Sequence, residues 1–221
     1  MKKINKKQLS FPLISTLILL FFSTIIILHL PTIFKFKSLE STVERIFGTE
    51  YKLYLDIDGE ISYNAFPSPH LFISKGKISI YENTADESSS NFKDMKIYVP
   101  LNQLYTRRID KINKVELNGI NLKLKIEDII SLRKHLYFSL NKKITINNSN
   151  IFIMNKKNET ILISPITNID YFLDIKNKSK KLEMSGNIFD IDFSSEWKRD
   201  YSQPNTSSNI INLDDLKMQI K

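Results

Sequence analysis

The chain has 221 residues, with 32 Lys and Arg against 24 Asp and Glu, and it contains no cysteine. This length suits one folded domain with a substantial core. The lack of cysteine excludes disulfides, thiolate nucleophiles and cysteine-ligated metals. Most of the basic residues are lysines scattered among Asn and Ile, without the basic stripe that is typical of a nucleic-acid surface, so the composition argues against nucleic-acid binding.

The amino-terminal end combines a basic start with a long apolar segment. Four lysines among the first seven residues precede an uncharged run, Gln8–Phe34. As a helix, Leu9–Phe34 would reach ~39 Å at ~1.5 Å per residue, which is enough to cross a hydrocarbon core of ~30 Å. We therefore predict a basic cytoplasmic segment at 1–8 and a transmembrane signal anchor at 9–34.

A cleaved signal peptide is the alternative interpretation of this segment. Its apolar part exceeds the roughly 7–15 residues of a signal sequence, and no A-x-A-like site follows, since the first alanine is Ala65. The lysines before the segment outnumber Lys35 and Lys37 after it, so the positive-inside rule places the remaining chain outside the cytoplasm. We expect a single-pass protein of the bacterial inner membrane whose carboxyl-terminal domain lies in the periplasm.

A short juxtamembrane helix is expected at 35–49. Ser38 is suited to cap its start, Leu39, Val43 and Ile46 recur at helical spacing, and Gly48 is suited to end it.

From residue 50 to 221 the pattern changes to the period of two that is typical of half-buried strands. YKLYLDI and EISYNAF flank Asp58-Gly59, and NKVEL and INLKLKI flank Asn118-Gly119. Because Asp-Gly and Asn-Gly favour two-residue turns, we predict a hairpin at each position.

Further strands are separated by short polar turns such as Asn147-Asn148 and Lys156-Lys157-Asn158, a spacing that favours antiparallel meanders. Short helices are expected at Leu101–Tyr105 and Ile126–Phe138. The predicted fold is mainly β, with an N-terminal transmembrane helix followed by an antiparallel, curved β-sheet groove or half-barrel and two or three short helices. The further strands are expected at 71–81, 94–100, 143–146, 150–154, 159–164, 168–175, 181–194 and 209–221.

Two carboxylate clusters are the strongest candidates for chemistry. Asp56 and Asp58 precede Glu60, and Asp190 precedes Asp192; residues i and i+2 of a strand share a face and could hold Ca²⁺ or act as acid and base. The structural explanation is the stronger one: a turn accounts for Asp58, and a solvated strand face accounts for Asp190 and Asp192. The three histidines are isolated in sequence, and no nucleophile elbow or phosphate-binding glycine loop occurs. We predict no catalytic, metal or cofactor site, and a protein that is not an enzyme.

Two blocks of the sequence carry a family resemblance. They are VERIFGTEYKLYLDIDGEISYNAFPSPHLFISKGKISI and MKIYVPLNQLYTRRIDKINKVELNGINLKLKIED. In this order they resemble the amino-terminal region of the AsmA family, whose members are anchored in the bacterial inner membrane by one helix. With the anchor, the resemblance covers about residues 9–130. The residues that carry it include Gly48, Gly59, Pro67, Pro69, Leu71, Pro100, Leu101 and Leu104.

The resemblance implies a groove of β-strands whose apolar concave face accepts phospholipid acyl chains, as in bridge-like lipid-transfer proteins, and a role in phospholipid transport or outer-membrane assembly. Family members are usually much longer, so we expect a short member, a fragment, or one piece of a larger assembly. The residues expected to line the groove are Leu53, Leu55, Ile61, Leu122, Leu124, Ile151 and Ile153.

Two alternatives fit the same pattern. An ordinary half-buried sheet that covers its own core would alternate in the same way. A membrane-anchored scaffold or secretion subunit of the LptC type would bind proteins through its β domain. The last predicted strand, 209–221, is expected to leave an open edge with which other envelope proteins could pair.

Overall fold

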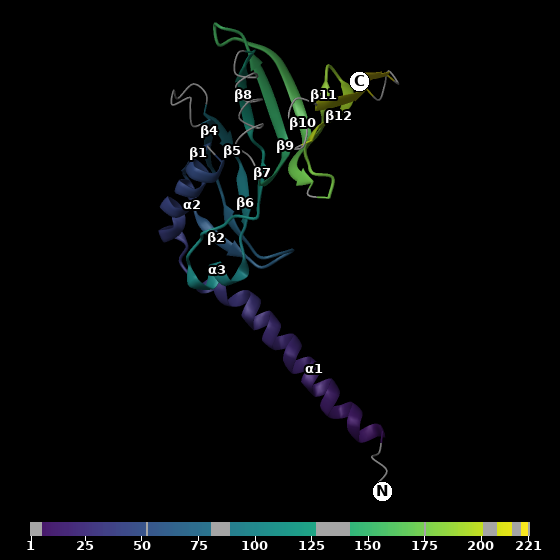
Figure 1. Ribbon diagram of the computed structural model, residues 1–221. Helices are drawn as coiled ribbons and strands as arrows, with labels where there is room; N and C mark the ends of the chain where they lie inside the picture. Colours follow the sequence, from purple (N-terminus) through teal and green to yellow (C-terminus); the bar gives the residue numbers. More distant parts are fainter. Residues whose placement is uncertain are drawn as a thin grey trace.

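The computed structural model describes residues 6–51, 53–80, 89–126, 142–174, 176–200, 207–213 and 218–220. A long helix, α1 (Lys6–His29), extends from a β-rich domain (Figure 1). It continues into the 3-10 helix η1 (Leu30–Ile33). Within the described residues, Pro12–Ile33 is long and apolar enough to cross a membrane, and its most apolar 18-residue stretch has no buried residue. The expected N-terminal apolar helix is therefore confirmed.

The chain after η1 forms a compact helical segment with three parts: η2 (Lys37–Leu39), α2 (Glu40–Ile46) and the π-helical η3 (Phe47–Tyr51). Two details of the sequence prediction are wrong. Ser38 lies inside η2 and makes no capping hydrogen bond. Gly48 does not end the helix, because the buried side chains of Phe47 and Tyr51 carry it through one further turn.

The remaining described chain is mainly strand, with one more helix, α3 (Leu101–Thr106), which confirms that prediction. The helix expected at Ile126–Phe138 lies outside the described residues apart from Ile126. The strands are β1 (Leu53–Ile57), β2 (Ile61–Asn64), β3 (His70–Ile73), β4 (Gly76–Ile80), β5 (Ser90–Phe92), β6 (Asp94–Tyr98), β7 (Lys114–Asn118), β8 (Asn121–Lys125), β9 (Lys143–Met154), β10 (Thr160–Asp174), β11 (Ser179–Ile188), β12 (Ile191–Asp200), β13 (Ser207–Leu213) and β14 (Met218–Ile220).

The strands form two sheets. A three-stranded sheet has the order β1-β4-β5, and the main sheet has the order β2-β3-β6-β7-β9-β10-β11-β12-β13-β14, with β8 also paired to β9. Neighbours are antiparallel except that β7 and β8 both run parallel to β9. The main sheet is curved and does not close (Figure 1). The predicted mainly β fold with a curved, open sheet is confirmed.

The hairpin predicted at Asp58-Gly59 is wrong. β1 pairs with β4, whereas β2 pairs with β3, so this dipeptide joins two sheets. The Gly59 amide donates to the Lys75 carbonyl (3.1 Å), and the Ser74 amide donates to the Glu60 carbonyl (3.3 Å). The stretch 53–64 is therefore one bent strand beside 70–80. Glycine is needed at the bend because a Cβ at Gly59 would lie 2.2 Å from the Ser74 hydroxyl oxygen.

The hairpin predicted at Asn118-Gly119 is also wrong, because β7 and β8 lie end to end along β9. The Gly119 amide donates to the Asn147 carbonyl, and the Asn150 amide donates to the Ile120 carbonyl, each at 3.0 Å. Gly119 has a φ of 65° and Asn148, beside it on β9, a φ of 47°. Both residues take the left-handed backbone conformation without a change of register, and the expected Asn147-Asn148 turn is an irregularity within one continuous strand.

Three further boundaries differ from the prediction. The segments 159–164 and 168–175 join in β10, which bulges between Ile166 and Asn168. The segment 181–194 is divided between β11 and β12 by a turn at Phe189 and Asp190, whose φ angles are positive. The segment 209–221 contributes two strands, β13 and β14. The turn at 156–158 is confirmed, since the Asn155 amide donates to the Glu159 carbonyl (3.0 Å).

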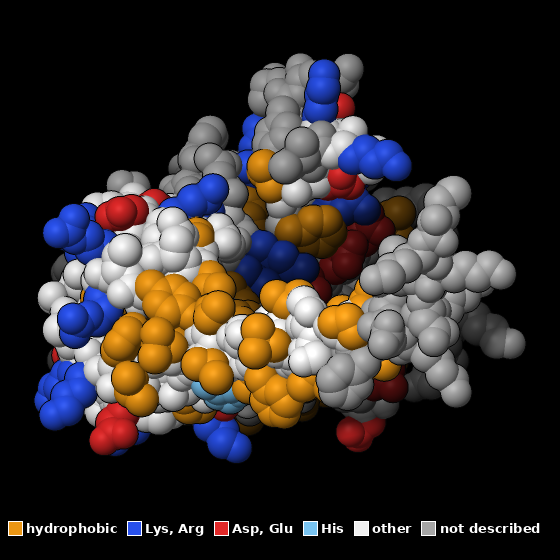
Figure 2. Space-filling model, turned by 90° about the horizontal axis from the view of Figure 1, so that it is seen from below, with side chains coloured by type: hydrophobic (Ala, Val, Ile, Leu, Met, Phe, Trp, Pro, Cys, Tyr) orange, Lys and Arg blue, Asp and Glu red, His pale blue; other side chains and the backbone are white. Residues whose placement is uncertain are grey.

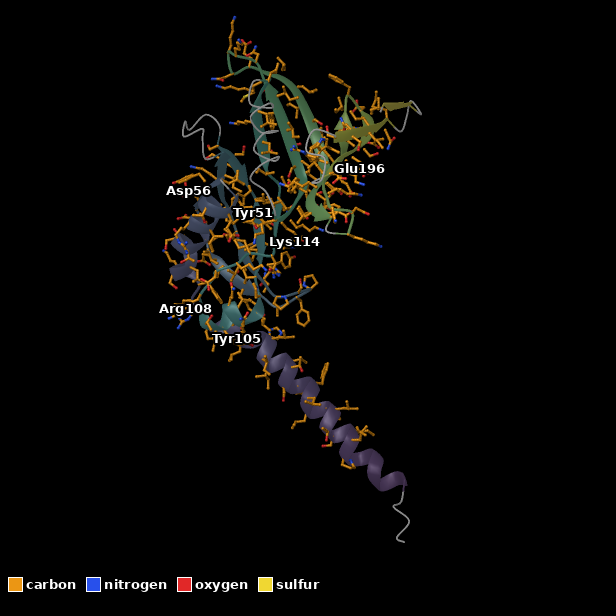
Figure 3. The ribbon with its side chains drawn as sticks, viewed as in Figure 1. Tyr51, Asp56, Tyr105, Arg108, Lys114 and Glu196 are labelled. Carbon is orange, nitrogen blue, oxygen red and sulfur yellow. The ribbon has the colours of Figure 1, made fainter. Side chains whose placement is uncertain are left out.

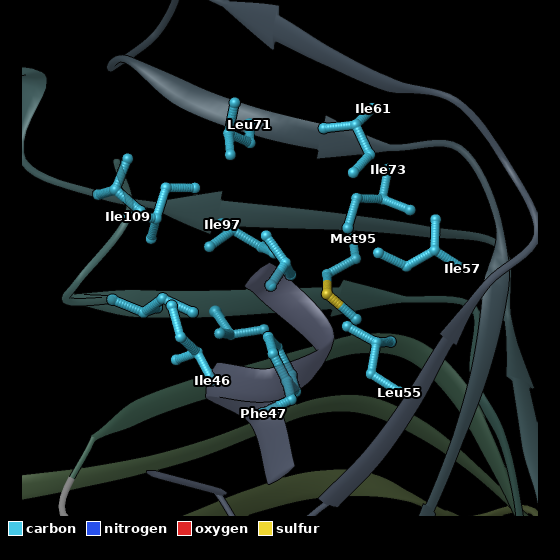
Figure 4. Close-up of a cluster of buried hydrophobic side chains, with 14 of the residues drawn as sticks. Ile46, Phe47, Leu55, Ile57, Ile61, Leu71, Ile73, Met95, Ile97 and Ile109 are labelled. Atoms are coloured by element: carbon cyan, nitrogen blue, oxygen red, sulfur yellow. The ribbon is translucent and has the colours of Figure 1, made fainter. Parts of the chain in front are cut away.

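The hydrophobic core lies between the α2–η3 segment and one face of the sheets (Figure 4). Ile46 and Phe47 contribute from the helical side, and Leu55, Ile61 and Ile97 from the strands. We call this sheet face, which carries those three strand residues, the inner face. Val43 and Ile97 are both fully buried, so the core has no solvent-exposed gap at its centre.

We expect Ile97→Ala to lower the free energy of unfolding by about 2–5 kcal/mol, because it leaves a cavity in the core. The measurement is urea unfolding of the full chain in detergent micelles, followed by circular dichroism. Ile161→Ala is the matched control: Ile161 is 56% exposed, and its replacement is expected to change stability by less than about 0.5 kcal/mol. Equal effects of both substitutions would contradict this account of the core.

Candidate functional site

The inner face continues as an apolar row beyond the strands that α2 covers. Val115 on β7 pairs with Ile144 on β9, and Ile144 pairs with Tyr171 on β10. Tyr171 pairs with Leu182 on β11, and Leu182 pairs with Trp197 on β12. Directly paired residues share a sheet face, so this row crosses five strands. Val115, Ile144 and Tyr171 are buried, whereas Leu182 and Trp197 are half-buried.

A second apolar patch lies farther along β8 and β9. Leu122 pairs with Ile151, and Leu124 pairs with Ile153. All four side chains are half-buried, and Leu122 packs against the core. Because side chains alternate along a strand, Lys123 lies on the opposite face. We call these four residues the distal patch.

The seven residues predicted to line a groove fall into two groups. Four of them form the distal patch. Leu55 and Ile61 are 1% and 9% exposed and pack within the chain's own core, while Leu53 is half-buried against it. These three side chains therefore pack against the protein itself instead of forming an open surface.

The residues of the family resemblance have structural positions. Gly59 lies at the bend between the sheets, and Pro67 and Pro69 lie in the loop between β2 and β3. Leu71 and Leu104 are fully buried. The others take part in helices: Gly48 lies in η3, Pro100 precedes α3, and Leu101 begins it.

The opposite face carries an ionic cluster on β6 and β7. The Tyr98 hydroxyl donates to Glu116 Oε2 (2.9 Å), Lys114 forms an ion pair with Glu116, and Lys96 Nζ lies 4.0 Å from Glu116 Oε2. Burial raises the pKa of the Glu116 carboxyl, but the hydrogen bonds from Lys114 and Tyr98 and the two lysine charges outweigh it and lower the pKa. Burial, followed by the contact with Glu116, raises the pKa of Tyr98 to about 12.

Beside this cluster lies a polar cavity of about 260 Å³. The Asn118 amide donates to Asp94 Oδ2 (2.8 Å), and the Asn168 amide donates to Asn147 Oδ1 (3.0 Å). The sequence analysis missed this feature, although asparagines at matching places in successive strands were a signal for it. Its groups can form hydrogen bonds with a polar ligand. The lining residues are Asp94, Lys96, Glu116, Leu117, Asn118, Asn147, Asn148 and Thr167.

The two carboxylate clusters lie at turns and bends. Asn187 Oδ1 accepts a hydrogen bond from the backbone amide of Asp190 (2.9 Å), and the side-chain amide of Asn187 donates to Asp192 Oδ1 (3.1 Å). Asp190 and Asp192 thus stabilise the turn between β11 and β12. Asp56 is half-buried on β1, and Asp58 is exposed at the bend. Across the described ranges, no three His, Asp or Glu side chains are grouped so as to hold a metal ion.

Comparison of the sequence with models of protein families found no match, and comparison with curated proteins found none either. The resemblance to the AsmA family therefore stays a prediction based on the residues given above.

We expect Glu116→Gln to weaken the dependence of stability on acid pH. The lowered pKa of Glu116 means that its carboxylate stabilises the fold above the ordinary value of 4.5, and that this contribution is lost as the pH falls through the folded-state pKa. The wild type should lose about 1–2 kcal/mol more than the variant between neutral and strongly acidic pH, as for a hydrogen bond to a charged group.

The free energy of unfolding at each pH is the quantity to measure. Glu60→Gln provides the control, because the Glu60 side chain is exposed. Equal pH dependence of the wild type and Glu116→Gln would contradict this prediction.

Proposed function

We propose that this chain is an AsmA-like protein, anchored in the bacterial inner membrane by α1, that contributes to phospholipid transport or outer-membrane assembly by binding acyl chains on the inner face of its sheet. The observation that carries this proposal is the half-buried end of the apolar row, where Leu182 pairs with Trp197, together with the distal patch.

The part of the row that an acyl chain can reach is its half-buried end. Leu182 and Trp197 lie on neighbouring strands, β11 and β12, whereas Val115, Ile144 and Tyr171 are buried in the protein's own core. Each CH₂ group removed from water would contribute about 0.8 kcal/mol.

The sequence supports the proposed placement. Four lysines precede the apolar helix, and the positive-inside rule then leaves the β domain on the periplasmic side. The family resemblance points to the same compartment. In this arrangement the protein binds phospholipid through its acyl chains, without covalent chemistry.

A scaffold of the LptC type is the second candidate, and one observation favours it. β14 pairs with β13 and is the last strand at one edge of the main sheet. In the part of the chain that the structure describes, no strand pairs with the other side of β14. An edge of this kind can add a strand from a partner protein.

Photocrosslinking from two neighbouring residues of β8, which lie on opposite faces of the sheet, tests the lipid proposal. A photoreactive residue at Leu124 is expected to give phospholipid adducts in mass spectra of full-length protein purified from membranes, because Leu124 belongs to the distal patch. The same residue at Lys123, on the opposite face, is the control. Protein adducts without lipid adducts at Leu124 would overturn the lipid proposal and favour the scaffold.

Substitution of the distal patch provides a second prediction. Ile151→Asp with Ile153→Asp is expected to reduce co-purifying phospholipid severalfold, because two charges would enter the acyl-chain surface. The matched control is Ile161→Asp with Ile163→Asp, since these isoleucines on β10 are 56% and 51% exposed and Ile163 pairs with Phe152, which alternates with Ile151 and Ile153 along β9. A similar lipid content in both double variants would count against the inner face as the binding surface.

A further inference from the structure

The last turn of α1 is fixed to the β domain by two tyrosine side chains. The Tyr63 hydroxyl donates to the Leu28 carbonyl (2.8 Å), and the Tyr105 hydroxyl donates to the Ile27 carbonyl. The last carbonyls of a helix have no partner within the helix, so these bonds satisfy groups that would otherwise need water. Leu28 also packs against the core. The domain is therefore joined rigidly to α1.

The loop between β2 and β3 lies beside the same turn of α1. The Phe66 ring is 5.7 Å from the His29 ring, yet Phe66 is 65% exposed. At the end of α3, the Arg107 guanidinium lies 5.6 Å from the centre of the Phe34 ring, and both Arg107 and Arg108 are exposed. We call the loop 65–69 and the segment 105–108 the foot of the domain. Tyr105 and Arg108 lie where the domain meets α1 (Figure 3).

These contacts lie within the apolar span and not beyond it. The span runs to Ile33, but the foot contacts α1 at Ile27, Leu28 and His29. At ~1.5 Å per residue, the chain from Leu28 to Ile33 corresponds to about 8 Å of the span. The polar layer on each side of a bilayer is roughly 5–8 Å thick. A membrane that covers the whole span therefore also reaches the foot.

The composition of the foot suits the polar layer of a membrane. Seen from the α1 side, Figure 2 shows a band of hydrophobic side chains that includes the exposed apolar residues of α1, with Lys and Arg side chains around it. Tyrosine is enriched at membrane interfaces, where its ring is apolar and its hydroxyl polar. Arginine forms paired hydrogen bonds with phosphate. Asp110, two residues after Arg108, is the acidic residue nearest to this pair in sequence.

We propose that the foot is seated in the headgroup layer of the membrane, with Phe66 among the upper acyl carbons and Arg107 and Arg108 at phospholipid phosphates. This inference rests on the proposed membrane anchoring by α1. It does not require lipid on the inner face. The foot fixes the height and tilt of the β domain above the bilayer.

The chain contains no native cysteine, so single spin labels can test the seating directly. Phe66→Cys and Phe189→Cys, each labelled with a nitroxide in the full chain, are reconstituted into vesicles of phosphatidylcholine and phosphatidylglycerol. Phe189 is the matched control, because it is a phenylalanine in a strand-connecting turn with 79% exposure, far along the chain from the foot. The nitroxide collides with oxygen, which concentrates in the bilayer, and with a nickel chelate, which stays in water. The ratio of the first collision rate to the second is expected to be severalfold higher at position 66 than at position 189.

A second variant tests the two hydroxyl groups. Tyr63→Phe with Tyr105→Phe removes both bonds to α1 and keeps the rings. The collision ratio at 66 is expected to fall towards the ratio at 189, and an unchanged ratio would overturn the positioning role of the hydroxyls. Equal ratios at 66 and 189 in protein that floats with the vesicles would overturn the seating of the foot. Failure to float would instead overturn the anchoring by α1 on which the proposal rests.

Discussion

The packing of the α2–η3 segment against the inner face is the interaction on which the rest of the structure depends. Val43, Phe47 and Tyr51 are almost completely buried, and the Phe47 and Tyr51 rings stack with centres 4.8 Å apart. This segment fills the inner face of the first strands and so completes a core in a sheet that does not close. The later strands continue the same face with half-buried side chains. One sheet thus has a part that stabilises the fold and a part that can serve binding.

Close approach of strands at glycines allows the sheets to curve around this segment. A Cβ at Gly76 would lie 2.5 Å from the Asp56 carbonyl oxygen, and one at Gly186 would lie 2.4 Å from the Pro165 carbonyl oxygen. Contacts of this length are too short for any side chain. Together with the bend at Gly59 and the positive φ at Gly119, they let paired strands change direction without breaking the hydrogen-bonded ladder.

The local pattern predicted where strands lie better than how they pair. Alternation identified β1, β6 and β7 correctly, because side-chain period is a property of a single strand. Asp58-Gly59 and Asn118-Gly119 misled the prediction, because glycine is needed for a close approach at Gly59 and for a positive φ at Gly119, and hairpin turns are not the only places with such needs. The Tyr63–Leu28 and Tyr105–Ile27 bonds join residues 35 and 78 positions apart. No local signal marks such contacts, because the folded sheet alone brings them together.

The foot and the apolar row belong to one hydrogen-bonded structure. Tyr63, which binds α1, is on β2, and the sheet order leads from β2 through β3, β6 and β7 to β9 and the apolar row. The linker between α1 and α2 is also fixed, since Phe36 and Leu39 are buried in the core. The linker is therefore packed onto the domain and does not form a free connection to α1. If the proposed seating of the foot holds, the sheet order gives lipid one path along the inner face, from β2 through β3, β6 and β7 towards the half-buried side chains of β11 and β12.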